Sequence, residues 1–217
     1  MTTGTLLTRS SGDLMDSIYR VQRHFYDVTR KYYLFGRDRL IRDLDLAVGA
    51  SVLEVGCGTG RNLAQIAHFW PGAQLYGLDI SSEMLKSARR KLGPRALLAQ
   101  GDATSFDPIA LLGRGQFDCV VLSYATSMMP GWQSAIETAL AALLPRGSLH
   151  VVDFGDFAGL PLPARAWLRR WLAAFHVTPR AELLPIIESL GKADRRSVEV
   201  RRGPAGYYLC LRVGPVA

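Results

Sequence analysis

The stretch Val52-Leu-Glu-Val-Gly-Cys-Gly-Thr-Gly60 decides the fold of this chain. A short, mainly apolar run meets three alternating glycines, and a helix-like segment, Arg61 to Phe69, follows. This order predicts a buried parallel strand with a ligand-binding loop at its carboxyl end. A glycine has no Cβ, so the loop backbone can take positive φ and approach a ligand closely. An ordinary tight turn is the alternative, and the strand that precedes the glycines disfavours it.

The glycine spacing separates two classes of cofactor. A dinucleotide-binding loop has the pattern Gly-x-Gly-x-x-Gly, which needs a glycine at position 61, and that position is Arg61. The stretch resembles instead the first motif of class I S-adenosylmethionine-dependent methyltransferases, an acidic residue followed by Gly-x-Gly-x-Gly. The resemblance implies that Glu54 lies near the methionine amino group of the cofactor. It also implies that the glycines contact the nucleoside: Gly56, Gly58 and Gly60.

Composition indicates one globular domain. The chain has 217 residues, of which 48% are hydrophobic, enough for one α/β core. The longest apolar stretches are far shorter than the roughly 18 residues that span a bilayer, and the N-terminus lacks an export signal. Three scattered cysteines fit a reducing compartment, so we expect a cytoplasmic protein. The formal charge of +7 permits an anionic lipid, nucleic acid or acidic substrate as partner.

Strand-like and helix-like segments alternate along the chain. The later strands are expected at 74–78, 96–100, 117–122, 148–153, 195–200 and 207–213, and the later helices at 82–92 and 131–144. The last two strands flank Gly203-Pro204 like a hairpin. We therefore expect an α/β fold: a doubly wound, mostly parallel, seven-stranded Rossmann-like sheet.

The segment before the first strand predicts a helical lid. Apolar side chains recur at steps of three and four, and Asp13 is a suitable cap for such a helix, which Gly36 is expected to break. The stripe consists of Leu14, Ile18, Val21, Phe25, Val28 and Tyr32. The expected organisation is a single methyltransferase domain over 1–217, with a mobile tail at 1–12, a helical lid at 13–45 and a catalytic core at 46–217.

Side chains at the ends of the next strands complete the expected cofactor site. Asp79 ends the second strand, where a carboxylate can accept hydrogen bonds from both ribose hydroxyls, or else serve the following helix terminus. Asp102 resembles the family's residue at the adenine amino group, with Ala103 offering a backbone amide, although a turn aspartate is the alternative. The remaining expected contacts are Ile80 and Met84 around the adenine, and Ser123 at the mouth of the crevice.

Methyl transfer from a sulfonium to an amine is an in-line displacement. The protein mainly has to align donor and acceptor and to keep the amine deprotonated and desolvated. Neither a metal nor metal-ligand spacing among the four histidines is expected. His176 is a candidate proton acceptor, with a structural loop histidine as the alternative. The catalytic candidates are Tyr26, Tyr124 and His176.

The segment Tyr26-Asp-Val-Thr-Arg-Lys-Tyr-Tyr33, continued by Leu-Phe-Gly-Arg-Asp-Arg39, is more distinctive than the glycine motif. It resembles the diacylglyceryl-homoserine N-methyltransferases of bacterial betaine-lipid synthesis, which add three methyl groups to the homoserine amine. Two further stretches, Val151-Val-Asp-Phe-Gly155 and Phe175-His-Val-Thr-Pro-Arg180, resemble the same family. Phosphatidylethanolamine N-methyltransferases share the core motifs and remain an alternative.

The resemblance implies a lipid headgroup as substrate and S-adenosylmethionine as methyl donor, with S-adenosylhomocysteine as product. A quaternary ammonium is held best by aromatic faces, and a homoserine carboxylate by a cation such as Arg37. Tyrosines that pack a helix on the sheet are an equally weighted alternative. The committed substrate contacts are Tyr19, Arg30, Lys31, Tyr32 and Tyr33.

Two features predict reversible contact with the inner face of a membrane. Seven Lys or Arg against two Asp lie between Tyr19 and Arg42, which favours anionic lipid. A second amphipathic segment, Ala164 to Phe175, places Trp167 and Trp171 near arginines, as in interfacial helices, although covering the sheet is the commoner use. No nucleic acid partner is expected. The competing functions are methylation of another small molecule or RNA, and non-catalytic cofactor binding by a membrane adaptor.

Overall fold

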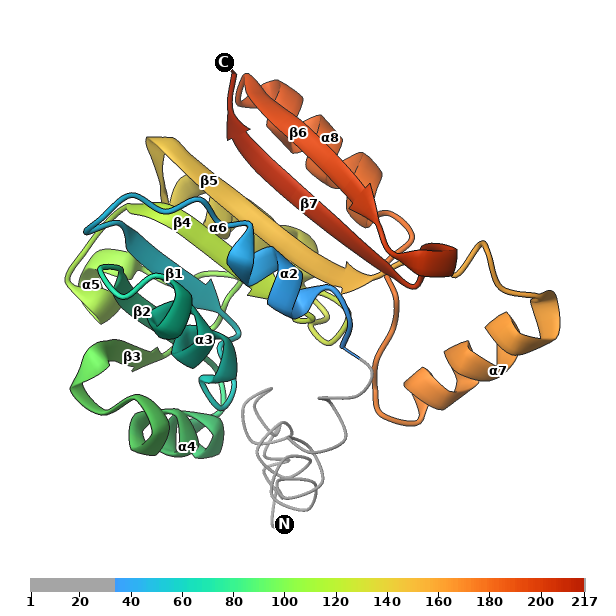
Figure 1. Cartoon of the computed structure of the whole chain (residues 1–217), viewed down its shortest axis with the longest axis horizontal. Coiled ribbons are helices and arrows are strands. Elements are labelled where there is room, and N and C mark those ends of the chain that lie inside the picture. Colours follow the sequence, from blue (N-terminus) through green and yellow to red (C-terminus); the bar gives the residue numbers. More distant parts are fainter. Residues whose placement is uncertain (1–33, 217) are drawn as a thin grey trace, which may run out of the picture.

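The computed structural model describes residues 34–216, which form a seven-stranded sheet with helices on both faces (Figure 1). The strand order is β3-β2-β1-β4-β5-β7-β6, and β7 runs antiparallel to both of its neighbours. The strands are β1 (Ser51–Val55), β2 (Gln74–Asp79), β3 (Ala96–Gln100), β4 (Phe117–Ser123), β5 (Leu143–Phe154), β6 (Arg196–Arg202) and β7 (Tyr208–Pro215). This architecture confirms the doubly wound fold expected from the alternating pattern.

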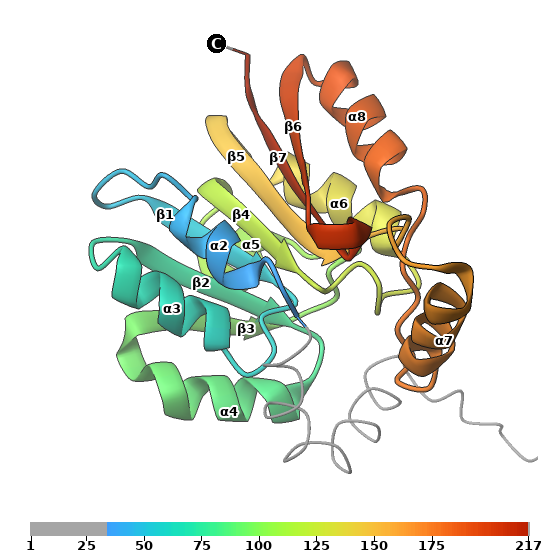
Figure 2. The same ribbon diagram turned by 45° about the vertical axis from the view of Figure 1, so that its right-hand side comes forward.

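The helices form two layers that bury separate apolar clusters against the sheet (Figures 1 and 2). One layer contains α2 (Arg37–Arg42), α3 (Arg61–Phe69) and α4 (Ser82–Leu92). The other contains α5 (Pro108–Leu112), α6 (Trp132–Ala141) and α8 (Leu183–Ala193). The central strand β1 is buried along its whole length, as a parallel strand covered on both faces must be.

Strand register brings the chemistry to one edge of the sheet. Val55 pairs with both Leu78 and Leu122, and Ser123 pairs with Val152, so β1, β2, β4 and β5 end side by side. The remaining helix, α7 (Leu162–Ala173), lies beyond this edge in both views (Figures 1 and 2). A ligand crevice at the carboxyl ends of parallel strands is where such folds bind their cofactors.

Local patterns predicted most element bounds, and three expectations need correction. The expected helix 131–144 ends at Ala141, because Leu143 pairs with Phe117 and already belongs to β5. Gly36 does not only end a helix: it takes φ 80° directly before α2, so that a new helix begins at Arg37. Helices α5 and α8 were not foreseen, since one is short and the other lies between expected strands.

The N-terminal lid is only partly covered by the description. Residues 13–33 of the expected lid and the tail 1–12 lie outside the described residues. Within the lid, α2 packs on α3, and the indole of Trp70 donates to the carbonyl of Ile41 at 2.8 Å. Across residues 34–216 no helix has the length and apolarity that crossing a bilayer requires.

Candidate active site

The glycine corner after β1 is held by backbone hydrogen bonds to β2. The amides of Gly56 and Cys57 both donate to the carbonyl of Leu78, at 2.8 and 2.9 Å. Gly58 and Gly60 take φ values of 53° and 72°, which side chains with a Cβ rarely adopt. A Cβ on Gly58 would meet open space, whereas a Cβ on Gly60 would lie 2.8 Å from Leu92 of α4. Gly58 therefore faces the ligand side, while Gly60 serves helix packing.

Asp79 is tied to this corner from the end of β2. One carboxylate oxygen accepts from the amide of Gly58 at 2.7 Å, and the other accepts from the amide of Ser81 at 2.9 Å. The side chain is buried, and Ser81 in turn caps α4 by accepting from Met84. Asp79 thus combines both readings of the sequence: it orders the helix start, and it lies at the strand end where a ribose is expected.

Glu54 points into a pocket at the same edge. This pocket has a volume of about 490 Å³ including its open mouth, and it is lined by Leu34, Arg37, Glu54, Gly56, Cys57, Gly58, Thr59, Arg61, Asn62 and Ser123. One Glu54 oxygen accepts from the Asn62 amide at 2.6 Å, and the other has no hydrogen-bond partner among residues 34–216. Burial raises the pKa of Glu54 to about 8. A buried acceptor of this kind suits a cationic ligand group.

The residues expected around the adenine lie farther along the edge. Asp102 is exposed, and one of its oxygens accepts from the amide and hydroxyl of Thr104, as a turn aspartate does. Ile80 is half-buried, while Met84 and Ala103 are buried. These positions are compatible with an adenine site, and the individual contacts stay predictions.

The end of β4 carries Ser123 and Tyr124. Ser123 lines the pocket, and its buried hydroxyl has no partner within the described part of the chain. Tyr124 is buried, with its ring edge-on to Phe154 at 4.8 Å between centroids. Its hydroxyl donates to the carbonyl of Phe35, and burial raises the pKa of the phenol well above its usual value. This geometry gives Tyr124 a structural hydrogen bond in place of the aromatic face that the sequence suggested.

The other catalytic and substrate candidates divide into two groups. His176 is exposed, at φ 58°, just after α7. The remaining candidates lie outside the described residues, so the expected cage stays a prediction: Tyr19, Tyr26, Arg30, Lys31, Tyr32 and Tyr33. Among residues 34–216 no group of three or more His, Cys, Asp and Glu is placed to hold a metal ion.

Two charged residues that the sequence analysis did not single out shape the loop after β4. Asp153, buried at the end of β5, accepts from the Thr126 hydroxyl at 2.5 Å and from the Ser127 amide at 2.9 Å. Arg180 donates to the carbonyls of Thr126 and Met129 at 3.1 and 2.8 Å. A charged residue inside the apolar run of β5 was the available signal. Because this loop borders the crevice, the two side chains set the shape of the acceptor side.

Helix α7 splits the apolar face that the sequence predicted. Leu168 and Leu172 are buried in the core, whereas the Trp167 side is 66% exposed and Phe175 is 40% exposed. The rings of Trp167 and Trp171 stack at 6.5 Å, and Phe175 contacts Trp171 edge-on at 5.0 Å. The helix is linked to the acceptor loop, because the Thr178 amide donates to the carbonyl of Ser127 at 2.8 Å. An aromatic ladder therefore stands beside the crevice.

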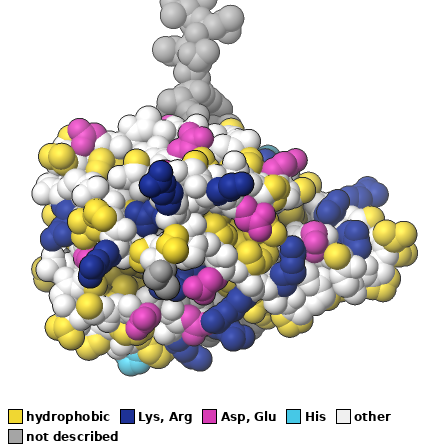
Figure 3. Space-filling view, turned by 90° about the horizontal axis from the view of Figure 1, so that it is seen from above, with side chains coloured by type: hydrophobic (Ala, Val, Ile, Leu, Met, Phe, Trp, Pro, Cys, Tyr) yellow, Lys and Arg dark blue, Asp and Glu magenta, His cyan; other side chains and the backbone are white. Residues whose placement is uncertain are grey.

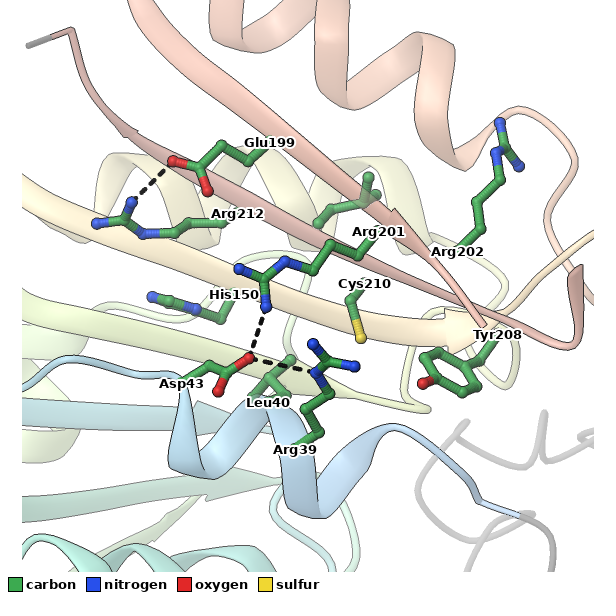
Figure 4. A pocket seen from close by; sticks show the side chains of 11 residues that line it. Arg39, Leu40, Asp43, His150, Glu199, Arg201, Arg202, Tyr208, Cys210 and Arg212 are labelled. Atoms are coloured by element: carbon green, nitrogen blue, oxygen red, sulfur yellow. Dashed lines mark hydrogen bonds and ion pairs between the residues drawn. The ribbon is translucent and has the colours of Figure 1, made fainter. Parts of the chain in front are cut away.

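A second groove lies between α2 and the β6–β7 hairpin (Figure 4). Its rim is an ion-pair network: Asp43 of α2 accepts from Arg201 at 2.7 Å and lies 3.5 Å from Arg39, and Glu199 pairs with Arg212. These arginines already have carboxylate partners, and all are well exposed. The groove therefore secures the outer side of α2 on the sheet and does not resemble a ligand site.

Comparison with known proteins gives the class to which this geometry belongs. Residues 52–147 match a family model described as a methyltransferase domain. The chain is 32% identical over 119 residues to a trans-aconitate 2-methyltransferase from Azoarcus sp., covering 53% of this chain and 45% of that protein. It is 30% identical over 163 residues to the ubiquinone/menaquinone biosynthesis C-methyltransferase UbiE from Syntrophotalea carbinolica, covering 71% and 65%. The chain thus spans about half to two thirds of these relatives.

Similarity in three dimensions extends over nearly the whole chain. A complex of DhpI with SAH has a TM-score of 0.67 at 21% identity, with 95% of this chain and 98% of that chain covered. At this identity the likeness concerns the fold. These proteins do not carry the lipid resemblance of the N-terminal segment, so the acceptor remains to be inferred from the site.

Proposed function

We propose that this chain, which belongs to the class I S-adenosylmethionine-dependent methyltransferases, methylates the amine of a lipid headgroup at a membrane surface. Diacylglyceryl-homoserine is the acceptor that the Tyr26–Arg39 segment favours, with three methyl groups added to the homoserine nitrogen. The observation that carries the proposal is a cofactor-type pocket at the strand ends with an exposed aromatic helix beside it.

The cofactor assignment depends on groups that the pocket leaves ready for a ligand. Gly58 has open space in front of its backbone, and Asp79 ends β2 beside it. Glu54 has one buried oxygen without a partner among the described residues, which suits an ammonium group. S-adenosylmethionine supplies a methyl group activated on a sulfonium, and the residues named here hold its amino-acid and ribose parts. The residues present therefore fit the cofactor.

The acceptor side of the crevice is built to position a substrate. Asp153 and Arg180 together hold the loop over 125–130 from two directions, so the backbone that borders the incoming amine is fixed. A fixed, partly dry crevice aligns the nucleophile and limits its solvation, which is the main requirement of an in-line displacement.

The aromatic ladder of α7 supports an acceptor at an interface. Trp167, Trp171 and Phe175 lie at i, i+4 and i+8, and Leu162 at the start of the helix is 74% exposed. Arg165 and Arg169 flank them. Tryptophans beside arginines insert into the headgroup region of a bilayer, and salt does not screen that apolar contribution. By contrast, the face in Figure 3 mixes basic and acidic side chains and offers no patch of one sign.

Methylation of a quinone-like acceptor is a second candidate. It is favoured by the UbiE relative, whose 163-residue match reaches beyond the cofactor half of the chain. Such an acceptor would receive the methyl group on carbon, so it needs no cationic product site.

The deciding experiment offers labelled S-adenosylmethionine together with three acceptors in separate vesicle preparations. These are diacylglyceryl-homoserine, phosphatidylethanolamine and a demethylated quinone, each followed by mass spectrometry of the extracted lipid. The proposal expects up to three methyl groups on the homoserine nitrogen. Methylation confined to the quinone would replace it with the second candidate, and cofactor binding without any methylated product would indicate an adaptor.

Docking is tested with a matched pair of variants. Trp167→Ala should weaken binding to vesicles and lower turnover of lipid in vesicles more than of lipid in detergent micelles. Ile109→Ala removes a side chain that is 67% exposed on α5, in the opposite helix layer, and should change neither. Equal losses in vesicles and micelles would show that Trp167 serves the fold and not the interface.

A further inference from the structure

The pocket beside Glu54 gathers most of the unsatisfied buried polar atoms of the described chain. Four side chains that line it each have a buried atom without a hydrogen-bond partner among residues 34–216. They are Arg37 Nε, Glu54 Oε2, Asn62 Oδ1 and Ser123 Oγ. Each such atom costs about 1–3 kcal/mol when left unpaired. A cluster of donors and acceptors in one pocket indicates a ligand that carries both kinds of group.

Arg37 is the cation of this cluster. Its side chain is 8% exposed, and within residues 34–216 no carboxylate is paired with it. The nearby acids are engaged: Asp38 binds Arg61 at 2.8 Å, and Glu54 accepts from Asn62. Burial, followed by the neighbouring Arg61, lowers the pKa of Arg37, yet a guanidinium remains charged at neutral pH. A buried cation of this kind calls for an anionic group from the ligand.

The backbone before Arg37 is anchored by aromatic side chains. The hydroxyl of Tyr124 donates to the carbonyl of Phe35, two residues before Arg37. Between them Gly36 takes φ 80°, and a Cβ there would lie 2.5 Å from the ring of Tyr208. Phe35 itself packs edge-on against Tyr207 at 5.3 Å. The entry of α2 is therefore fixed, and with it the direction of Arg37.

Tyr124 is held firmly enough to serve as an anchor. Its ring is buried against Phe154, and its amide donates to the carbonyl of Val152 at 2.7 Å. It also takes φ 53°, a backbone conformation that costs a residue with a Cβ about 1 kcal/mol or more. Such strain persists only when the surrounding contacts enforce it.

We propose that Arg37 binds the carboxylate of the amino-acid part of the cofactor, opposite Glu54 at its ammonium, and that Tyr124 positions Arg37 through the Phe35 carbonyl. This inference rests on the proposed function for its cofactor. It reassigns Arg37, because the sequence suggested a homoserine carboxylate as its partner, and it gives Tyr124 the role of a positioning residue. The pocket then recognises a zwitterion, with one charged side chain from the core and one from α2.

The experiment compares two ligands by calorimetry. S-adenosylhomocysteine carries the amino-acid part, and 5′-methylthioadenosine has the same nucleoside and sulfur without it. Arg37→Gln should weaken S-adenosylhomocysteine at least tenfold, since a charged hydrogen bond contributes about 1.5–3 kcal/mol, and should leave methylthioadenosine unchanged. Arg37→Lys should recover part of the loss. Arg39→Gln, on the outer side of the same helix, is the matched control and should change neither ligand.

Tyr124→Phe removes the hydroxyl but keeps the ring. We expect a threefold to tenfold loss for S-adenosylhomocysteine, no change for methylthioadenosine, and little further loss when it is combined with Arg37→Gln. Equal weakening of both ligands, or full additivity in the double variant, would overturn the positioning role. Unchanged S-adenosylhomocysteine affinity in Arg37→Gln would overturn the carboxylate assignment. If the unaltered protein binds neither ligand, the proposed function fails instead.

Discussion

The cofactor side and the acceptor side of the crevice are built in different ways. On the cofactor side, the glycine corner and Asp79 come from β1, β2 and the turn between them, and their contacts span at most 21 residues of sequence. On the acceptor side, Arg180 reaches Thr126 across 54 residues, and Tyr124 reaches Phe35 across 89. One half follows from local motifs, and the other half exists only once distant segments meet.

This difference explains how one fold can serve different acceptors. The local half fixes the cofactor, and its pattern matches a family whose members act on unlike substrates. The long-range half consists of loops and an added helix, which can change without disturbing the glycine corner. Function is therefore decided where the sequence pattern is weakest.

The sharpest way to break the comparison is to remove Asp79. Asp79→Ala deletes the acceptor for Gly58 and Ser81 and the expected partner of two ribose hydroxyls. Affinity for S-adenosylhomocysteine should fall at least tenfold in calorimetry, since each such bond contributes about 1.5–3 kcal/mol. Asp107→Ala is the control, because Asp107 also accepts from two backbone amides but at the start of α5. Unchanged affinity in Asp79→Ala would contradict the assignment.

Glu54 provides a test by pH. Its pKa is about 8 in the folded protein against 4.5 for an ordinary glutamate, so between these values only the folded state holds the proton. The free energy of unfolding of the cofactor-free protein should therefore fall as pH rises towards 8, by up to about 1.4 kcal/mol per unit. Urea titrations at pH 6.5 and 8 measure this slope.

Glu54→Gln should flatten that slope, because an amide does not titrate. His150 does not interfere, since burial lowers its pKa to about 4 and its effect appears only as pH falls below 6.5. Parallel pH profiles for the two proteins would show that Glu54 is ionised in the empty pocket.

Asp153 tests the acceptor side. Asp153→Ala leaves the amides of Ser127 and Phe154 without their carboxylate, so we expect a loss of about 1–3 kcal/mol in unfolding free energy. Turnover should fall severalfold, with S-adenosylhomocysteine affinity within threefold. Asp118→Ala is the matched control: Asp118 accepts from Ser51 at the opposite end of β4, so stability should fall while turnover per folded molecule is kept. Equal effects on turnover would deny the loop a specific role.

The smallest effect is expected on the outer side of α2. Asp43→Ala removes the ion pairs with Arg201 and Arg39, both exposed, and should cost about 0.2–1 kcal/mol in urea unfolding, less at high salt. Cofactor affinity should stay within twofold. Glu199→Ala, which breaks only a pair inside the hairpin, serves as the comparison. A large loss of affinity in Asp43→Ala would show that α2 is positioned from outside and not by Tyr124.

The sequence by itself determined the sheet, most helix bounds, and the cofactor residues at the strand ends. Hydrophobic periodicity and glycine spacing act over a few residues, so β1, α3 and the corner between them follow directly from the chain. The same reasoning placed Asp79 and Asp102 at one edge, because parallel strands end together.

Only the tertiary structure decided what Arg37, Tyr124, Asp153 and Arg180 do. Each of these side chains takes its role from a partner or a pocket formed by segments far away in sequence, and no local pattern encodes such a meeting. The same holds for α7, whose apolar face is divided between core and solvent by the position of the sheet beneath it. Periodicity reports that a face is apolar, whereas burial depends on what the rest of the chain brings against it.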